Sequence, residues 1–277
     1  MTFSPCGVIT LTSDFGHRGP FVGVMKGQIL VRFPAARIID FTHEIHAHWP
    51  VEAGFWLARS YRYFPEGSVH VAVVDPGVGS SRSIVALEAD GHLFLAPDNG
   101  LLAPLQAQVR LAKGDASEVE ARAFRLDSTF LHGLRLPRPS ATFHGRDIFA
   151  PVAAELAAGR HAPESLGPLI EELVPSWVEE PAESRDQVSG IVITLDNFGN
   201  LITNIESRRV QRFRQPVVRT GNQEFLLRRT YSDAKPGDYL ALVNSFDVVE
   251  IARVEQSAAE GLGVGRGAPV LVSDKIP

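Results

Sequence analysis

The segment SVHVAVVD (68–75) is a nearly continuous apolar run of strand length. A strand with one face in water alternates apolar and polar residues, whereas a strand of a parallel sheet is buried on both faces and shows no such alternation. The run therefore predicts a buried strand of a parallel sheet. It constrains the fold more than any other segment of the chain.

The segments around this run alternate between strand-like and helix-like patterns. Apolar, β-branched runs predict strands at 7–13, 37–42 and 68–75, and helical spacing predicts helices at 20–33, 49–64 and 147–159. In the first of these helices, Phe21, Met25, Ile29 and Phe33 recur at the spacing that places them on one face.

Turn signals complete the first part of the chain. Asp90-Gly91 joins the runs 83–89 and 92–97 into a predicted hairpin. Asp147 is expected to start the helix at 147–159, and Gly159 is expected to end it. The β-α-β-α-β order predicts an α/β domain over residues 1–175, with a mainly parallel central sheet.

The pattern changes after about residue 159. Residues 162–187 hold four prolines (163, 168, 175 and 181) and many acidic residues, which is typical of a connector, and we assign 176–187 as the linker. Beyond it, short alternating runs are separated by turn signals, without a clear helix. This pattern predicts a smaller antiparallel β-barrel or sandwich over residues 188–277.

Composition and charge argue against several classes of function. A net charge of −5 is unlike the basic surface of a general nucleic-acid binder, so the arginines within 208–214 and at 228–229 are interpreted as solvated strand faces, with a phosphate patch as the alternative. No run approaches the roughly 20 apolar residues of a membrane helix, the start lacks a signal-peptide pattern, and the one cysteine, Cys6, cannot form an internal disulfide. We expect a cytoplasmic protein with no nucleic-acid or membrane partner.

Two loops directly follow predicted strands, where open α/β sheets bind their ligands. Asp14 lies in SDFG (13–16), and its carboxylate could accept both hydroxyls of a ribose or could cap the next helix. Asp75 and Arg82 flank the tight turn DPGVGSSR. The guanidinium fork could hold a water or a carboxylate, or the ion pair could only stabilise the conformation of the loop. Neither GxGxxG nor GxxxxGK[ST] occurs, which argues against a dinucleotide or nucleoside-triphosphate site.

Two further loops carry candidate residues. His144, in TFHGRDIF (142–149), could act as an acid, a base or a hydrogen-bond donor near neutral pH, provided that Asp75 and Arg82 lie near it; a lone histidine in a turn is otherwise structural. In DNFGN (196–200), Phe198 offers an aromatic face for a base, and Asn200 offers a donor and an acceptor for its edge. The alternative there is an ordinary β-turn.

A cluster of His43, His46 and His48 with Glu44 is dense enough to suggest a metal site. It matches no strong ligand pattern such as HExxH, and no partner cysteine accompanies it. In an extended segment His46 and His48 would share a face, and His43 would not. We therefore expect no bound metal.

Taken in order, these motifs resemble the family of S-adenosyl-L-methionine (SAM) hydroxide adenosyltransferases, which are related to the SAM-dependent fluorinase and chlorinase. The matching motifs cover almost the whole chain: SDFG (13–16), FVGVMKG (21–27), DFTHEI (40–45), FPEG (64–67), HVAVVDPGVGSSR (70–82), APDNGLL (96–102), TFHGRDIFAP (142–151), DNFGN with TN (196–204) and NSFDVVEIA (244–252). No single motif is decisive, but the ordered set is specific.

The resemblance implies a hydrolysis in which water, behaving as hydroxide, attacks the ribose C5′ of SAM and releases adenosine and L-methionine. It implies no cofactor, because a sulfonium is already a good leaving group. The family's Asp, Arg and His map onto Asp75, Arg82 and His144, so Arg82 and His144 would hold the water and Asp75 would orient them. The halogenating relatives have other residues at the Asp and His positions, and a serine where this chain has Gly145.

The resemblance also implies the substrate contacts, with two departures from the family pattern. The implied contacts are Asp14 for the ribose, Trp49 as a pocket wall, Phe198 and Asn200 for adenine, Asp196 for the methionine ammonium, and Ser245, Glu250 and the backbone of Ala258 for the C-terminal part of the site. The family usually has Asp in place of Gly19 and Asn in place of Ser257. These changes are expected to affect affinity and substrate range rather than the type of reaction, because the triad is intact.

The resemblance further implies a homotrimer whose sites form between the N-terminal domain of one subunit and the C-terminal domain of the next. A non-catalytic adenosine- or SAM-binding protein is the alternative from another class, and a SAM-dependent halogenase is a less favoured one. Asp75, Arg82 and His144 together favour the hydrolase, since a binding protein does not need that combination.

Overall fold

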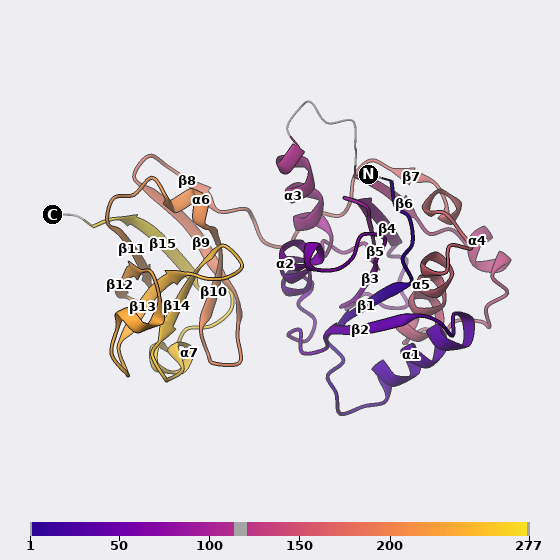
Figure 1. The fold of residues 1–277 in the computed structure, drawn as a ribbon, viewed down its shortest axis with the longest axis horizontal. Helices are drawn as coiled ribbons and strands as arrows, with labels where there is room; N and C mark the ends of the chain where they lie inside the picture. Colours follow the sequence, from indigo (N-terminus) through magenta and orange to yellow (C-terminus); the bar gives the residue numbers. More distant parts are fainter. Residues whose placement is uncertain (1, 114–120, 276–277) are drawn as a thin grey trace. The chain divides into compact units, whose positions relative to one another are not determined.

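The computed structural model describes residues 2–113 and 121–275, which divide after Trp177 into two compact units (Figure 1). Each unit has its own buried apolar core. In the part of the chain that is described, no helix is long and apolar enough to cross a membrane.

The N-terminal unit is built on a seven-stranded sheet with the strand order β2-β1-β3-β5-β4-β6-β7. The strands are β1 (Val8–Ser13), β2 (Arg37–Thr42), β3 (Val69–Val73), β4 (Ile84–Ala89), β5 (His92–Pro97), β6 (Arg122–Arg125) and β7 (Leu169–Ile170). β2, β1, β3 and β5 pair in parallel, and β4, β6 and β7 extend the sheet in antiparallel pairings. The predicted α/β class and the predicted hairpin of β4 and β5 are confirmed.

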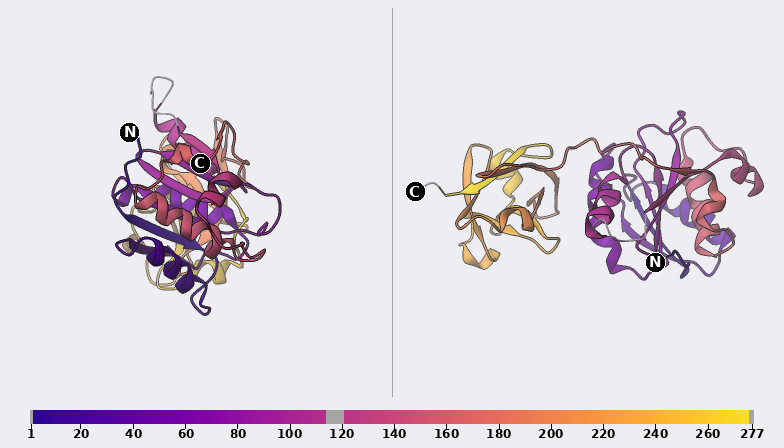
Figure 2. Two further views of the ribbon diagram at one scale, coloured as in Figure 1. Left: turned by 90° about the vertical axis from the view of Figure 1, so that its right-hand side faces the viewer. Right: turned by 90° about the horizontal axis from the view of Figure 1, so that it is seen from above.

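Helices cover both faces of this sheet, as Figures 1 and 2 show. They are α1 (Phe21–Arg32), α2 (Pro50–Ser60, continued by the 3-10 turn Tyr61–Tyr63), α3 (Ala103–Lys113), α4 (Ser128–Gly133) and α5 (Ala150–Ala157), with another 3-10 turn at Pro163–Leu166. Side chains of α1 and α5 join one apolar cluster with β1 and β3, and side chains of α2 and α3 join the other with β4 and β5. β3 is fully buried between the two clusters, as its apolar run predicts.

A π-helical turn, Gly145–Phe149, runs directly into α5. The Ala150 N–H donates to the carbonyl of Gly145, five residues earlier, and every residue of α5 is buried. The prediction that Asp147 starts this helix is wrong, because Asp147 lies inside the turn. Its carboxylate instead accepts hydrogen bonds from the Arg146 side chain and from the Ser140 N–H. Gly159, with a φ of 68°, follows the helix end as expected.

The C-terminal unit is a closed barrel of seven strands with one short added strand. The strands are β8 (Ala182–Glu183), β9 (Gln187–Leu195), β10 (Leu201–Glu206), β11 (Pro216–Thr220), β12 (Gln223–Arg228), β13 (Tyr239–Val243), β14 (Val248–Arg253) and β15 (Pro269–Asp274). Their order is β10-β14-β13-β12-β11-β15-β9-β8, and the pairing of β10 with β9 closes the barrel. All neighbours are antiparallel except β12 and β13, so the predicted antiparallel barrel is confirmed.

Several elements have no counterpart among the sequence predictions. The helices α3 and α4 and the strand β6 were not predicted, and the proline-rich connector contributes β7 to the first sheet and β8 to the barrel. The C-terminal unit also has a 3-10 turn, Tyr231–Asp233, and two short helices, α6 (Ser207–Val210) and α7 (Ala258–Leu262), where no helix was expected. Helices of four or five residues are too short to give a periodic apolar pattern.

Candidate active site

The carboxyl ends of β1 and β3 bring two predicted site loops to the same edge of the sheet. The two strands are parallel neighbours, and Ser13 lies opposite Val73 in their register. Asp14 follows β1 directly, and Asp75 follows β3 by two residues. Both carboxylates therefore leave the sheet at the edge where α/β proteins bind ligands.

Arg82 contacts both other members of the predicted triad. Its Nε donates to Asp75 Oδ1 at 2.9 Å and lies 3.0 Å from Oδ2, and its Nη2 donates to Asp75 Oδ2. Nη2 also lies 2.9 Å from Nδ1 of His144. The structure thus brings Asp75, Arg82 and His144, which are separated by up to 69 residues, into one hydrogen-bonded cluster.

The ion pair in this cluster is largely withdrawn from water. The side chains of Arg82 and Asp75 are only 11% and 4% exposed. Breaking a buried pair by removing one partner costs about 3–5 kcal/mol, because the other charge stays buried and uncompensated. Asp75 thus fixes the position of the guanidinium as well as neutralising it. In the described part of the chain, Arg82 Nη1 donates to no protein group, so it can face a bound water.

The contact with Arg82 fixes which tautomer His144 adopts. A guanidinium has only donors, so Nδ1 of His144 must accept, and the ring proton of the neutral form lies on Nε2. Burial and the nearby Arg82 cation hold the pKa of His144 below its usual value, against the opposing charges of Asp75 and Asp147. At neutral pH the ring is therefore uncharged and presents an N–H donor at Nε2.

The loop between Asp75 and Arg82 is held by its own hydrogen bonds and by a close backbone contact. The Ser80 hydroxyl donates to the Gly77 carbonyl at 2.7 Å and accepts from the Arg82 N–H at 3.2 Å. Gly79 has a φ of 80°, and a Cβ on it would lie 2.3 Å from the carbonyl oxygen of Ala141. Only glycine allows this approach, which brings the loop against the segment that leads to His144.

Asn99 is a structural support for the site that sequence reasoning missed. Its Nδ2 donates to the carbonyl of Val74 at 2.9 Å, and its Oδ1 accepts from the Leu101 N–H at 3.3 Å. It thereby holds the residue that immediately precedes Asp75. The motif APDNGLL was the available signal, since it contains Asn99, but the resemblance assigned it no role.

The two other predicted site residues of this unit lie in loops at the same sheet edge. Asp14 Oδ2 accepts a hydrogen bond from the His48 N–H at 2.9 Å. Trp49 comes next in the chain and packs edge-on against Trp177, with ring centroids 6.1 Å apart. The Nε1 of Trp49 is buried and has no hydrogen-bond partner among the described residues.

The histidine cluster does not gather around a common point. His43 is buried and bonded to Ser13 and Asp40, whereas the side chains of His46 and His48 are exposed. Within residues 2–113 and 121–275, no three His, Cys, Asp or Glu side chains are placed to hold a metal ion.

In the C-terminal unit, the turn between β9 and β10 holds three predicted substrate contacts. Asp196 Oδ1 accepts from the backbone N–H groups of Phe198 and Asn200, and its Oδ2 accepts from Asn200 Nδ2 at 2.8 Å. The ring of Phe198 is 77% exposed and available for stacking. Asn200 is buried, and one of its two amide protons is used by Asp196.

The start of α7 is attached to this turn. The Ala259 N–H donates to the carbonyl of Gly199 at 2.9 Å, so Ala258 lies close to Phe198. Ser257, at the position of the second departure from the family pattern, caps the helix by accepting from the Glu260 N–H at 3.1 Å. Its hydroxyl is thus used within the protein.

Glu250 and Ser245 lie on and near β14. Glu250 is buried and accepts from the Tyr231 hydroxyl at 2.5 Å and from Asn244 Nδ2 at 3.1 Å. Burial raises its pKa, and the charge of nearby Asp196 raises it further, while the two hydrogen bonds oppose the rise. Ser245 is exposed and follows Asn244 in the β13–β14 turn. Tyr231 and Asn244 were not predicted; Asn244 begins the motif NSFDVVEIA, which also contains Glu250, whereas Tyr231 lies in none of the quoted motifs.

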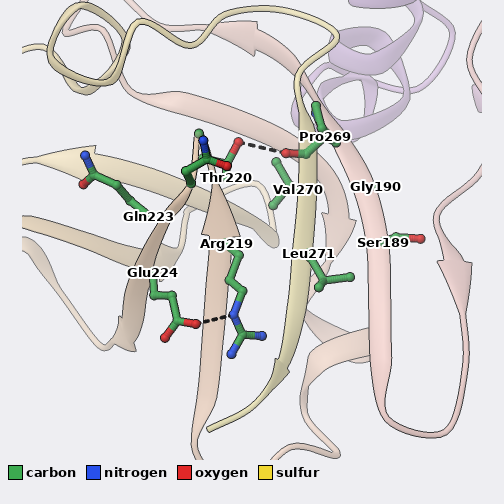
Figure 3. A pocket seen from close by; sticks show the side chains of 11 residues that line it. Ser189, Gly190, Arg219, Thr220, Gln223, Glu224, Pro269, Val270 and Leu271 are labelled. Atoms are coloured by element: carbon green, nitrogen blue, oxygen red, sulfur yellow. Dashed lines mark hydrogen bonds and ion pairs between the residues drawn. The ribbon is translucent and has the colours of Figure 1, made fainter. Parts of the chain in front are cut away.

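A separate hollow of about 510 Å³ lies over β9, β11, β12 and β15, and Figure 3 shows the residues that line it. Its Thr220 hydroxyl donates to the Pro269 carbonyl at 2.8 Å, and Arg219 donates to Glu224 at 2.5 Å. None of its lining residues is a predicted site residue. The predicted substrate contacts of the C-terminal unit therefore lie elsewhere on the barrel.

Comparison with known families and proteins gives consistent matches along the chain. The model of the SAM hydroxide adenosyltransferase N-terminal domain matches residues 9–167, and that of the C-terminal domain matches residues 190–271. A Thermus thermophilus protein named (R)-S-adenosyl-L-methionine hydrolase is 37% identical over 93% of this chain and 96% of its own length. A solved structure of a conserved Thermotoga maritima protein has a TM-score of 0.83 and 32% identity, covering 96% of this chain and 99% of that one.

Halogenating enzymes are more distant relatives. A fluorinase from an Actinoplanes species is 25% identical over 96% of this chain and 97% of its own length. At Gly145, where the halogenating pattern has a serine, an added Cβ would lie 3.1 Å from the sulfur of Met25 and 3.2 Å from the ring of Phe143. The site is therefore tightly packed at the position that would carry the serine hydroxyl.

Proposed function

The chain belongs to the SAM hydroxide adenosyltransferase family, and we propose that it hydrolyses SAM to adenosine and L-methionine. The observation that carries this proposal is the contact of Arg82 with both Asp75 and His144 at the ligand-binding edge of the sheet. Relatives that are 31–37% identical and named (R)-S-adenosyl-L-methionine hydrolase support it.

The proposed reaction is a displacement at the ribose C5′. The oxygen of a water molecule forms a bond to C5′ while the C5′–S bond breaks, and the electron pair of that bond passes to sulfur. Methionine leaves as a neutral thioether, the water oxygen becomes the 5′-hydroxyl of adenosine, and one proton is released to solvent. Because the sulfonium is a good leaving group, the protein needs mainly to position the water and to favour its deprotonated form.

Two donors are available at the site. Nη1 of Arg82 can donate to that water, whereas the Nε2–H of His144 lies on the side of the ring that faces away from Arg82 and can donate to a second bound oxygen. Donors and a fixed positive charge stabilise a hydroxide-like oxygen more than they stabilise neutral water. Asp75 holds the guanidinium in place and lies on the side from which Asp14 would bind the ribose hydroxyls.

We propose that the other site residues bind the two ends of SAM. Trp49 forms a wall of the pocket, Phe198 stacks on adenine, and Asn200 with the backbone of Ala258 contacts the edge of the base. Asp196 neutralises the methionine ammonium, and Ser245 and Glu250 complete the C-terminal part. The exposure of Phe198 and the proximity of Asp196 to Glu250 support these roles.

We propose a homotrimer in which the N-terminal residues of one subunit and the C-terminal residues of the next complete each site. The presence of predicted site residues in both units supports this arrangement. Light scattering on the purified protein should give the mass of three chains.

The reaction is also proposed to need no metal or redox cofactor, since C5′ is already activated by the sulfonium. Hydrolysis by protein treated with a chelator should equal that of untreated protein. A rate that falls and is restored by added divalent metal would contradict this.

The test of the function is incubation of purified protein with SAM in water enriched in oxygen-18. Mass spectrometry should find the label in the 5′-oxygen of adenosine, together with unlabelled methionine, and Arg82→Ala and His144→Ala should abolish turnover. SAM recovered intact in a stoichiometric complex would identify a binding protein instead. A 5′-halogenated product formed in chloride or fluoride would identify a halogenase, which the packing around Gly145 disfavours.

A further inference from the structure

Ser13, His43 and Asp40 form a hydrogen-bonded chain for which the proposed reaction has no use. Ser13 Oγ lies 2.7 Å from His43 Nδ1, and His43 Nε2 lies 3.1 Å from Asp40 Oδ1. At its ends, the Phe15 N–H donates to Ser13 Oγ at 3.3 Å, and Lys26 of α1 donates to Asp40 Oδ2 at 2.6 Å. This series of hydrogen bonds therefore connects the loop after β1 with the end of β2.

The direction of every proton in this chain can be assigned. Burial lowers the pKa of His43 despite the Asp40 carboxylate, so the ring is neutral at neutral pH. The carboxylate can only accept, so the ring proton lies on Nε2 and points to Asp40. Nδ1 must then accept the hydroxyl proton of Ser13, whose lone pair accepts from the Phe15 N–H.

A Ser–His–Asp sequence of hydrogen bonds is also the arrangement of a nucleophilic triad, but this serine cannot attack a substrate. Ser13 and His43 are each only 1% exposed. Both the proton and a lone pair of the hydroxyl are used within the protein. The arrangement consequently acts on the loop that carries it.

That loop holds Asp14, the proposed ribose ligand, between Ser13 and Phe15. Backbone contacts repeat the connection on either side, since the Gly16 N–H donates to the His43 carbonyl at 2.8 Å and the Ile45 N–H donates to the Ser13 carbonyl at 3.3 Å. The Asp14 carboxylate itself accepts from the His48 N–H. The Ser13 carbonyl and the Gly16 N–H, on either side of Asp14, are thus both hydrogen-bonded to the segment that contains His43.

We infer that His43 is a positioning residue that orients Asp14 through the Ser13 hydroxyl and thereby sets recognition of the ribose hydroxyls. The inference rests on the proposed function, because it takes Asp14 as the ribose ligand. It accounts for DFTHEI, a motif without an assigned role, and it gives His43 a function other than metal binding. Asp40 contributes by fixing the tautomer in which Nδ1 accepts.

The test compares two buried hydroxyl–histidine pairs on the same strand. Thr10 Oγ1 lies 2.8 Å from Nδ1 of His70, and both residues are buried, but Thr10 is three residues before Ser13 and away from the Asp14 loop. Ser13→Ala and Thr10→Val each remove one hydroxyl while keeping the rest of the side-chain volume. Calorimetry would give the Kd of wild type and both variants for adenosine and for 2′,3′-dideoxyadenosine, which lacks both ribose hydroxyls that Asp14 would bind.

Ser13→Ala should raise the Kd for adenosine roughly three- to tenfold, the usual effect of one hydrogen bond, and leave the Kd for dideoxyadenosine unchanged. In SAM hydrolysis it should raise KM by a similar factor with little change in kcat. Thr10→Val should change neither Kd. Equal preference for adenosine in Ser13→Ala and wild type would overturn the inference. If wild type neither consumes SAM nor distinguishes the two nucleosides, the proposed function itself fails.

A second pair of variants tests the route through Ser13. In His43→Asn the amide oxygen can take the place of Nδ1 and accept from Ser13, whereas His43→Gln can keep only the donor to Asp40. Both remove the same buried ring, so their losses of thermal stability should be similar. His43→Asn should keep more of the preference for adenosine over dideoxyadenosine than His43→Gln. Equal preferences, or the reverse order, would show that the Ser13 hydrogen bond does not orient Asp14.

Discussion

At the scale of single residues, Arg82 determines the geometry of the cluster because it touches both of the other members. Its planar fork donates in two directions at once, to the Asp75 carboxylate and to His144 Nδ1. A lysine ammonium is a point charge on a flexible chain and cannot reproduce that fork. The positive charge alone is therefore insufficient for the proposed role.

Arg82→Lys should for this reason lose most of the hydrolytic rate. We expect kcat to fall about 100-fold or more, as for removal of a positioned transition-state donor, with a small change in KM. Steady-state kinetics with SAM would measure both constants. Retention of more than half of the wild-type kcat would show that only the charge matters.

The protonation state of His144 predicts the acid limb of the pH profile. Because burial and Arg82 lower its pKa below 6.5, the ring stays neutral until the pH falls below its ordinary titration range. Protonation would place an N–H on Nδ1 opposite an Arg82 donor and would break their contact. We expect kcat/KM to be level down to pH 6.5 and to fall only below it. Asp147→Asn removes a charge that favours the protonated ring, so it should move this limb to still lower pH; an acid limb above pH 6.5 would contradict the assignment.

At the scale of secondary-structure elements, the cluster depends on a close contact between two loops. The turn that follows β3 meets the segment before His144 at Gly79, whose Cβ position is occupied by the Ala141 carbonyl. This contact joins segments more than 60 residues apart. Arg82 and His144 each follow it by three residues, so the contact holds them near one another.

Gly79→Ala should separate these loops. The substitution combines a left-handed φ of 80° with a Cβ placed 2.3 Å from a backbone oxygen, so it should lower both kcat and the melting temperature. Gly263→Ala is the matched control, since Gly263 has a φ of 64° with open space around its Cβ position. If the two variants have the same activity and the same melting temperature, the loop contact has no role.

The sequence was most informative where a strand ends and least informative about contacts across the fold. Asp14 and Asp75 could be placed at one sheet edge because each closes an apolar run, and the parallel order follows from the same runs. The contact of His43 with Ser13 could not be predicted, since Ser13 lies 30 residues away in the chain, and His43 was weighed only as a metal ligand, a role that its spacing did not favour. Helix α3 was missed because, among its positions 103–109, only Leu105 and Val109 are buried.

At the scale of the whole molecule, each unit carries part of the proposed site, and some of these site residues lower the stability of the unit that holds them. In the C-terminal barrel, Glu250 is a buried carboxylate whose pKa is raised by burial. A raised pKa in the folded state means that its contribution to stability is present at low pH and is lost as pH rises through that pKa. The hydrogen bonds from Tyr231 and Asn244 reduce this loss.

Tyr231→Phe removes one of those hydrogen bonds and should raise the pKa of Glu250 further. The free energy of unfolding should fall by about 1 kcal/mol at pH 7, because the ionised carboxylate loses a donor and the hydroxyl is partly exposed. The loss should shrink toward pH 4, where Glu250 is protonated in both proteins. Denaturant unfolding of the full chain at both pH values would measure it, and a loss that is the same at both would contradict the coupling.

Co-expression of two variants tests both the proposed trimer and the proposed sharing of its sites. Arg82→Ala disables the N-terminal part of a site, and Phe198→Ala disables the C-terminal part without opening a cavity, since Phe198 is 77% exposed. If each site combines two subunits, co-expression of the two inactive chains should restore about a quarter of wild-type activity, because one random pairing in four joins two intact parts. Mixing already assembled trimers is the control. No recovery on co-expression would indicate that each chain completes its own site.

The π-helical turn before α5 has a consequence for how this protein could change in evolution. Helix α5 is buried along its whole length, so the core fixes its rotation, and the additional residue in Gly145–Phe149 sets the angle at which His144 leaves the helix. Each residue of an α-helix turns the chain by about 100°. Deletion of Arg146, which lies outside the core, should swing His144 away from Arg82, because Ile148, Phe149 and α5 stay anchored in the apolar core. The proposed activity therefore depends on the length of one helical turn, and we expect a one-codon deletion to leave a chain that binds SAM without hydrolysing it, with every residue of the triad retained.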